Sequence, residues 1–341
     1  MLLGLGGRCS YTPCMKSSGK QLLFHEVGAP EKVLEVNSFT PRSPDDGEVT
    51  VRISATPINP ADLNTVEGTY GVKLDLPGVP GIEGCGVVEE SKAAGYKQGD
   101  RVMFLHRADT WSTHTTVSAD ILFKLPEGID MTQAAMLKVN PATAWQLLHG
   151  FAELKAGDWV VQNLGNSAVG RCVIQIARDM GVKTISFVRG ESTMDELKGL
   201  GADHVLIDDE EGRAAAKEVM EGANAALAFN AVGGDSALRV MKLLRESGTH
   251  ITYGAMGLKP VTVSNGLLIF RDIRVCGLWI TRWLDHAPDD EVRSVYEELA
   301  KRVAEGRIVQ PVDTTFALDD YKEALARLVA PERSGKVLLA P

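Results

Sequence analysis

The sequence predicts an α/β protein with a β-rich first part, followed by a doubly wound sheet covered by helices. Up to about Pro126, short runs such as EVTVRISATPIN (48–59) are cut by frequent Gly and Pro, a texture typical of a barrel or sandwich. From about Asp130, apolar strands alternate with helical stretches, which indicates a parallel sheet with helices on both faces. A chain of 341 residues is long for one core, so two domains are expected.

Strand and helix signals alternate regularly in the second part. Short apolar runs predict strands at 159–163, 184–189, 204–208, 226–232 and 249–256. Helical patterns are expected at 131–151 (around a proline), 173–181 and 236–247. The helix 173–181 gathers its apolar residues on one face, namely Val173, Ile174, Ile176, Ala177 and Met180. After a further helix at 289–306, a β-like stretch and a final strand at 336–340 are expected to return to the first part.

Composition excludes several function classes. The apolar fraction of 44% and the charged fraction of 24% are those of an ordinary globular protein. A net charge of −9, spread along the chain, argues against nucleic acid or an anionic membrane as the main partner. No apolar run reaches the roughly 18–20 residues that cross a bilayer. Scattered thiols without a CxxC pair suit a reducing compartment and packing roles, and they are Cys9, Cys14, Cys85, Cys172 and Cys276.

The N-terminus has an unusual charge pattern. The first twenty-five residues hold no acid and three basic residues, Arg8, Lys16 and Lys20. This pattern vaguely resembles that of a mitochondrial transit peptide but is too poor in Arg to be convincing, and an extended or tagged start before Met15 is equally open. We expect residues 1–20 to be a leader or a disordered N-terminus. A cytoplasmic location is favoured, with the mitochondrial matrix as the alternative.

The stretch QNLGNSAVG (162–170) joins a predicted strand to a predicted helix. Such a turn is where a dinucleotide pyrophosphate binds, because the first N–H groups and the dipole of the helix supply partial positive charge. Gly165 and Gly170 lie in the turn with Ala168 between them, which is not a strict GxGxxG. A tight strand–helix turn without a ligand remains the alternative.

The end of the next strand bears on the choice of cofactor. An NAD-binding unit places Asp or Glu there to bind the ribose 2′-hydroxyl. This chain has Arg189, nineteen residues after Gly170, and a cation complements a 2′-phosphate. NADP(H) is therefore favoured, a solvated strand-end Arg is the alternative, and the nearby Glu191 would weaken phosphate binding.

Several stretches together carry a family resemblance. They are INPADLNTVEGTYG (58–71), LPGVPGIEGCGVV (76–88), VNPATAW (139–145), QNLGNSAVG (162–170), 252–283 with YGAM and WITRW, and SGKVLL (334–339). In this order they resemble the 2-enoyl thioester reductases, the mitochondrial trans-2-enoyl-CoA reductase branch of the medium-chain dehydrogenase/reductase superfamily. The resemblance implies a GroES-like catalytic domain (21–132 and 284–341) and a Rossmann NADP-binding domain (133–283). It also implies a homodimer, formed through the edge strand near Leu268–Val275.

The resemblance also bears on metal binding. Zinc-dependent members of the superfamily use a Cys near the NPADL position and a GHE motif. This chain has Asn59 in NPADL and Ile82 before Glu83 in GIEG, and it lacks a four-Cys lobe. Because soft ligands are missing at both places, we expect no metal.

Reduction of an activated C=C bond is the chemistry that suits a zinc-free member. A thioester carbonyl makes Cβ electrophilic enough to accept hydride, and Cα then needs a proton. Tyr70, between Gly68 and Gly71, falls on the proton donor proposed for that family, so the resemblance implies that it is catalytic. A loop tyrosine packed on the barrel is the alternative.

Further site residues are implied by position within the resembling stretches. Arg189 would bind the 2′-phosphate, and the other expected cofactor contacts are Asn140, Asn166, Ser167, Ala168, Val169, Tyr253, Gly254, Ala255, Met256, Leu278, Trp279, Ile280, Thr281 and Lys336. A solvated role for Lys336 and a core or dimer-interface role for Trp279 remain open.

Three functions are compatible with these patterns. The first is an NADPH-dependent reductase of trans-2-enoyl thioesters in fatty acid synthesis, with a CoA- or acyl-carrier-protein-linked substrate. The second is a zinc-free quinone or alkenal/alkenone reductase of a sister branch, which would not need Tyr70. The third is a non-catalytic NADPH-binding protein. Acyl chain length and the choice between CoA and carrier protein stay open.

Overall fold

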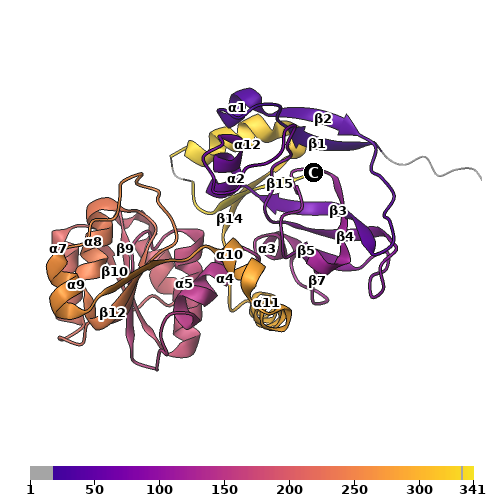
Figure 1. Cartoon of the computed structure of the whole chain (residues 1–341). Coiled ribbons are helices and arrows are strands. Elements are labelled where there is room, and N and C mark those ends of the chain that lie inside the picture. Colours follow the sequence, from indigo (N-terminus) through magenta and orange to yellow (C-terminus); the bar gives the residue numbers. More distant parts are fainter. Residues whose placement is uncertain (1–17, 332) are drawn as a thin grey trace, which may run out of the picture.

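The computed structural model describes residues 18–331 and 333–341 and shows two lobes (Figure 1). Most of the predicted leader, residues 1–17, lies outside the described residues, as do Cys9 and Cys14. The chain builds the first lobe, crosses into the second, and returns to the first with its last two strands. The predicted combination of a β-rich lobe with an α/β lobe is confirmed.

The first lobe is built on a seven-stranded sheet. Its order is β14-β15-β3-β4-β5-β7, and β6 pairs separately with β3. The strands are β3 (Glu48–Pro57), β4 (Cys85–Ser91), β5 (Arg101–Phe104), β6 (His114–Ser118), β7 (Leu122–Lys124), β14 (Val312–Ala317) and β15 (Lys336–Ala340). The antiparallel pairing of Leu338 with Pro57 bears out the predicted return of the final strand to this part.

Smaller elements complete the first lobe. A two-stranded antiparallel ribbon is formed by β1 (Gly19–Leu23) and β2 (Glu35–Phe39). The helical elements are α1 (Pro30–Val33), α2 (Pro60–Val66), η1 (Ala119–Ile121), η3 (Leu318–Asp320) and α12 (Tyr321–Val329). Helix α12 was not predicted from the sequence.

The second lobe is a six-stranded sheet in which every neighbouring pair is parallel. The order is β10 (His204–Ile207), β9 (Lys183–Val188), β8 (Trp159–Gln162), β11 (Ala225–Asn230), β12 (Leu244–Thr252) and β13 (Arg274–Gly277). The predicted doubly wound topology is therefore confirmed. Its helical elements are α5 (Ala168–Met180), η2 (Glu191–Thr193), α6 (Met194–Gly199), α7 (Glu210–Val219), α8 (Gly234–Lys242) and α9 (Asn265–Arg271).

Alternating side chains of the central strand β8 explain the two helical layers of this lobe. Val160 packs in a cluster with Cys172 of α5, whereas Val161 packs in another with Met241 of α8. Figure 1 shows α5 on the side of the sheet that faces the first lobe and α7, α8 and α9 on the other. Both faces are thus buried, so these strands read as continuous apolar runs.

Four helices form the joint between the lobes (Figure 1). They are α3 (Met131–Ala135), α4 (Asn140–His149), α10 (Ile280–His286) and α11 (Asp289–Ala304). One apolar cluster runs through the joint, from Met103 of β5 to Phe229 of β11, with the fully buried Tyr296 of α11 among its members. Among the described residues, no helix has both the length and the apolar character needed to cross a membrane.

Candidate functional site

The turn between β8 and α5 requires glycine at two positions. A Cβ on Gly170 would lie 2.5 Å from the carbonyl oxygen of Gly165, and a Cβ on Gly165 would lie 2.7 Å from the Cβ of Ser186. The Ser167 hydroxyl caps α5 by accepting a hydrogen bond of 3.0 Å from the Gly170 N–H. The Ala168 and Val169 N–H groups, which precede Gly170 in the first turn of α5, are then the ones that can bind an anion.

A buried arginine holds this turn in place. The Arg171 guanidinium donates to the Asn166 carbonyl, and it bonds both carboxylate oxygens of Glu196 at 2.8 Å each. Sequence reasoning missed Arg171, which occupies one position of an apolar helix and gave no separate signal. The ion pair links the turn, and with it the candidate phosphate cradle, to helix α6.

A cavity of about 450 Å³ opens beside the turn at the carboxyl ends of the strands. Side chains that line it include Asn166, Arg189, Asp208, Arg239, Met256 and Lys259. Arg189 follows β9 directly and is exposed, as predicted for a strand-end cation. Glu191 is not among the residues that line the cavity.

Charged groups that the sequence did not reveal surround Arg189 in this cavity. The Asp208 carboxylate accepts hydrogen bonds from Arg239 Nε at 2.8 Å and from the Ser236 hydroxyl at 2.5 Å. Lys259 adds a third cation beside Arg189 and Arg239. Because Asp208 and Asp235 also line the cavity, three cations face two carboxylates there, and this small excess of positive charge favours a phosphate. In the sequence, the only signal for these charged neighbours of Arg189 was the position of Asp208 at the end of a predicted strand.

Tyr253 contributes a buried hydroxyl without a hydrogen-bond partner among the described residues. It follows β12 and lies near Ser167, and burial raises the pKa of Tyr253 to about 12. The hydroxyl therefore stays protonated and can donate. An oxygen of a ligand in the cradle would satisfy it, so these residues fit a bound dinucleotide.

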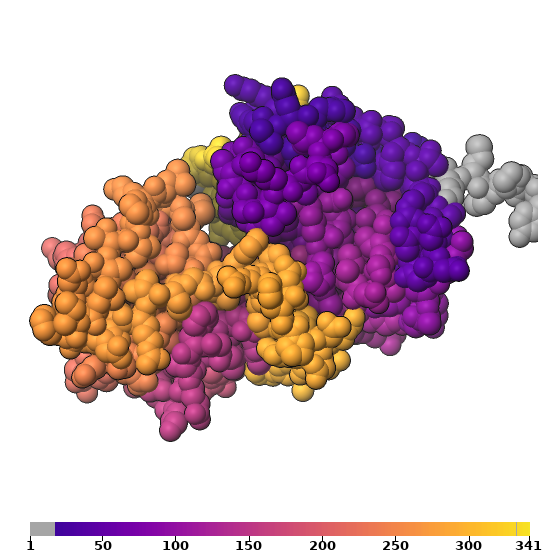
Figure 2. All heavy atoms as spheres, viewed as in Figure 1, coloured from indigo at the N-terminus to yellow at the C-terminus, as the bar shows by residue number. Residues whose placement is uncertain are grey.

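Tyr70 reaches from the first lobe to the second. It lies in a turn after α2, where its N–H donates to the Asn64 carbonyl at 3.0 Å and Gly68 adopts a φ of +73°. Its hydroxyl accepts a hydrogen bond of 2.9 Å from Trp279 Nε1, with the two rings 6.0 Å apart and nearly perpendicular. Trp279 precedes α10 and is 41% exposed. Figure 2 shows the surface indented where the two lobes meet.

The other predicted contacts fall in four places. Ala168 and Val169 form the first turn of α5. Gly254, Ala255 and Met256 follow β12, and Leu278, Trp279, Ile280 and Thr281 follow β13, so both groups lie at neighbouring strand ends. Asn140, at the start of α4, is buried and donates to Gln310 Oε1 at 3.1 Å. The remaining one, Lys336, is also buried, and its ammonium donates to the Ile58 carbonyl at 3.1 Å and to Asn59 Oδ1.

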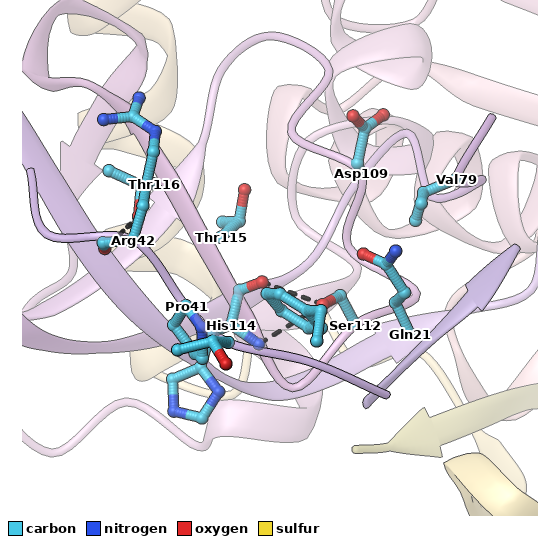
Figure 3. Close-up of a pocket in the computed structure, with 11 residues that line it drawn as sticks. Gln21, Pro41, Arg42, Val79, Asp109, Ser112, His114, Thr115 and Thr116 are labelled. Atoms are coloured by element: carbon cyan, nitrogen blue, oxygen red, sulfur yellow. Dashed lines mark hydrogen bonds between the residues drawn. The ribbon is translucent and has the colours of Figure 1, made fainter. Parts of the chain in front are cut away.

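A second cavity, of about 320 Å³, lies within the first lobe (Figure 3). Its charged side chains already have protein partners. Arg42 bonds both carboxylate oxygens of Glu48 at 2.5 and 2.6 Å, and Asp109 accepts from Arg107 at 2.9 Å. It contains none of the predicted site residues, and we assign it no chemistry.

Two family models match separate parts of the chain. Residues 45–127 match an alcohol dehydrogenase GroES-like domain, and residues 168–303 match a zinc-binding dehydrogenase. The chain is 36% identical to the mitochondrial enoyl-[acyl-carrier-protein] reductase of Xenopus tropicalis, over 98% of this chain and 99% of that protein. The chain belongs to the 2-enoyl thioester reductase family. The resemblance found in the sequence, to a branch of the medium-chain dehydrogenase/reductase superfamily, is thus confirmed.

Solved structures place this 2-enoyl thioester reductase among similar reductases. The complex of Etr1p with NADP and crotonyl-CoA superposes with a TM-score of 0.87 at 28% identity, covering 95% of this chain and 100% of that one. Etr1p is the mitochondrial 2-enoyl thioester reductase of Candida tropicalis. A putative NADPH:quinone reductase from Bacillus thuringiensis gives a TM-score of 0.88 at 28% identity, covering 95% and 99%.

The side chains of this reductase do not fit the zinc ion that the second family description implies. Asn59 Nδ2 donates to Glu83 Oε1 at 2.7 Å, and its Oδ1 accepts from the Lys336 ammonium, so a cation already occupies this neighbourhood. In the part of the chain that the structure describes, His, Cys, Asp and Glu form no group of three that could hold a metal. We therefore derive no step through zinc.

Proposed function

We propose that this chain catalyses the NADPH-dependent reduction of trans-2-enoyl thioesters to acyl thioesters. The observation that carries the proposal is the Tyr70 hydroxyl, held by Trp279 at the junction of the two lobes. The enoyl-[acyl-carrier-protein] reductase names of the relatives support a role in fatty acid synthesis.

The proposed mechanism assigns the proton to Tyr70. When bound, NADPH supplies the hydride that Cβ of the conjugated thioester accepts. Tyr70 then donates its proton to Cα or a hydrogen bond to the enolate oxygen. The Trp279 N–H donates to the phenolic oxygen, which orients the phenol and stabilises negative charge on it after proton transfer.

The cofactor contacts form the second part of the proposal. The pyrophosphate would lie over Asn166–Val169, and Arg189 would bind the 2′-phosphate with help from Arg239 and Lys259. The nicotinamide would lie between the strand ends at 253–256 and 278–281, with Asn140 nearby. The NADP complex of Etr1p supports this choice of cofactor. Lys336 acts indirectly, through its contact with Asn59, which in turn donates to Glu83.

A substrate panel tests the proposal. NADPH oxidation is measured with crotonyl-CoA, a longer 2-enoyl-CoA, an enoyl-acyl-carrier-protein and a simple quinone. We expect turnover of the enoyl thioesters, and the comparison of the two carriers decides between CoA and carrier protein. Turnover of the quinone alone would establish the second candidate, which the TM-score of 0.88 with a putative quinone reductase favours. NADPH binding without any turnover would establish a non-catalytic protein.

We propose that the reductase forms a homodimer through the β13 edge of its second lobe. Among the described residues, β13 has a neighbour on one side only, and α9 beside it exposes apolar residues, with Ile269 at 70% and Phe270 at 80% exposure. An open strand edge and exposed apolar side chains are features of an interface. The Etr1p/Etr2p heterodimer supports dimerisation in this family.

Location and domain division are further parts of the proposal. We propose the mitochondrial matrix rather than the cytoplasm, because the relatives are mitochondrial reductases. Import into isolated mitochondria, with loss of an N-terminal segment detected by mass spectrometry, tests this.

We retain the division into two domains, 21–132 with 284–341 and 133–283, although α10 (Ile280–His286) runs across the second boundary.

A further inference from the structure

Four charged side chains are buried together beneath the candidate site. Asp62 and Glu83 are fully buried, and Lys138 and Lys336 are 6% and 8% exposed. Two acids thus balance two bases among these buried side chains. Buried charges are retained only when ion pairs and hydrogen bonds satisfy them, so each contact in this cluster is informative.

Glu83 links the two sides of the site with its two oxygens. Oε1 accepts from Asn59 Nδ2 at 2.7 Å, and Oε2 accepts from the Val139 N–H at 2.9 Å. Asn59 is the N-cap of α2, and Val139 directly precedes Asn140 at the start of α4. Only a carboxylate accepts on both oxygens, whereas a glutamine side chain offers one acceptor.

The other members of the cluster fix the start of α2. Asp62 accepts from the Asn59 N–H and from the Ile82 N–H, both at 2.9 Å. The Lys336 ammonium donates to Asn59 Oδ1, which turns the Asn59 amide nitrogen toward Glu83. On the other side, Lys138 Nζ donates to the Ile82 carbonyl at 2.7 Å.

Helix α2 transmits this anchorage to Tyr70. It is seven residues long, Pro60–Val66, and the Asn64 carbonyl accepts from the N–H groups of Thr69 and Tyr70 at 2.9 and 3.0 Å. A short helix anchored at Asn59 therefore ends in the turn that presents the phenol. On the other side of Glu83, the first turn of α4 carries Asn140, the proposed cofactor contact.

We propose that Glu83, balanced by Lys336 and Lys138, is the positioning residue that sets the placement of Tyr70 relative to the second lobe. Lys336 supplies, from within the chain, the positive charge that a metal ion would bring to Asn59 and Glu83. The inference rests on the proposed function, because Tyr70 is taken as the proton donor. Burial raises the pKa of Glu83 while the Lys336 charge opposes the rise, and burial lowers the pKa of Lys138 to about 8.

The test compares Glu83→Gln, Lys336→Met and the double variant, with the exposed Glu90→Gln in β4, the strand that follows Glu83, as the control. Glu83→Gln removes one acceptor and leaves two ammonium groups facing one carboxylate. We expect kcat for crotonyl-CoA to fall at least tenfold while KM for NADPH stays within twofold. We expect the double variant, in which the buried charges balance again, to recover the Tm lost by Glu83→Gln but not kcat.

The double variant separates positioning from stability. If kcat recovers together with Tm, or if Glu83→Gln keeps kcat within twofold of wild type, the inference is overturned. If Glu83→Gln alone does not fold, kcat and Tm of the double variant are compared directly with those of wild type. A low kcat at wild-type Tm supports the inference.

A readout independent of turnover keeps this test distinct from that of the proposed function. The change in tryptophan emission caused by Tyr70→Phe reports the Trp279–Tyr70 contact. We expect that change in the wild-type background and its loss in the Glu83→Gln/Lys336→Met background. If Tyr70→Phe changes the emission of the double variant as much as that of wild type, the positioning role is overturned, even if crotonyl-CoA proves not to be a substrate.

Discussion

The indole N–H of Trp279 donates a 2.9 Å hydrogen bond to the hydroxyl oxygen of Tyr70. An indole nitrogen can only donate, so the phenolic oxygen is the acceptor in this pair. The hydrogen of the Tyr70 hydroxyl therefore remains free to point elsewhere. This division of roles gives the phenol a fixed direction and leaves its proton available to a substrate between the lobes.

Replacement of Tyr70 by Phe tests the proton donor. We expect kcat for crotonyl-CoA to fall by about 10²-fold or more, the usual contribution of general acid catalysis. The dissociation constant of NADPH should not change, because the cavity at Arg189 is left intact. Steady-state kinetics and a fluorescence titration with NADPH measure both quantities. An unchanged kcat would reduce Tyr70 to a packing residue.

Replacement of Trp279 by Phe tests the orientation of the phenol. The variant keeps an aromatic ring and removes one donor, so a loss of roughly 0.5–1.5 kcal/mol of transition-state stabilisation is expected. In a double-mutant cycle with Tyr70→Phe the two losses should not add, since both variants remove the same contact. Additive losses would mean that Trp279 acts independently of Tyr70.

Replacement of Arg189 by Ala tests cofactor choice. Loss of a charge-assisted phosphate contact costs about 1.5–3 kcal/mol, so KM for NADPH should rise about 10- to 150-fold. KM for NADH should stay nearly constant. The matched variant Glu191→Gln removes a negative charge two residues away and should lower KM for NADPH modestly. Equal effects of Arg189→Ala on both cofactors would refute the assignment.

The buried His250 predicts how stability depends on pH. Neither ring nitrogen has a hydrogen-bond partner among the described residues, and burial lowers the pKa of His250 from 6.5 to about 4. The unfolded chain therefore binds the proton first as pH falls. Stability present above pH 6.5 is lost toward pH 4, by at most about 3 kcal/mol. Urea unfolding of His250→Leu should lack this dependence, whereas the exposed control His286→Gln should keep it.

Replacement of Phe270 by Asp tests the dimer. This side chain is 80% exposed beside the edge strand β13, so a charge there should prevent association without unfolding the lobe. We expect a dimer for wild type and a monomer for the variant by analytical ultracentrifugation. A monomeric wild type would contradict the proposed interface.

Much of the fold could be predicted from the order of apolar runs. The strand expected at 184–189 is β9 (Lys183–Val188), because strands buried on both faces are continuously apolar. The helix expected at 236–247 ends earlier, since β12 begins at Leu244. Leu243 and Leu244 continue the apolar helical pattern past Lys242, where α8 ends, so the sequence gives no signal for the change from helix to strand.

Less of the site could be predicted, because its contacts join residues far apart in the chain. The turn at 162–170 and the strand-end Arg189 are local patterns. By contrast, Glu83 meets Val139 across 56 positions, and Lys336 meets Asn59 across 277. Charges at such separations give no periodicity, so the buried cluster and the Asp208–Arg239 pair became visible only in three dimensions.

The fate of crotonyl-CoA tests the central claim most directly. The chain is incubated with NADPH and crotonyl-CoA in deuterium oxide, and the acyl-CoA products are analysed by mass spectrometry. We predict butyryl-CoA with one solvent deuterium at Cα, formed about 10²-fold more slowly by Tyr70→Phe. Recovery of unchanged crotonyl-CoA from an enzyme that oxidises NADPH with a quinone would contradict the account.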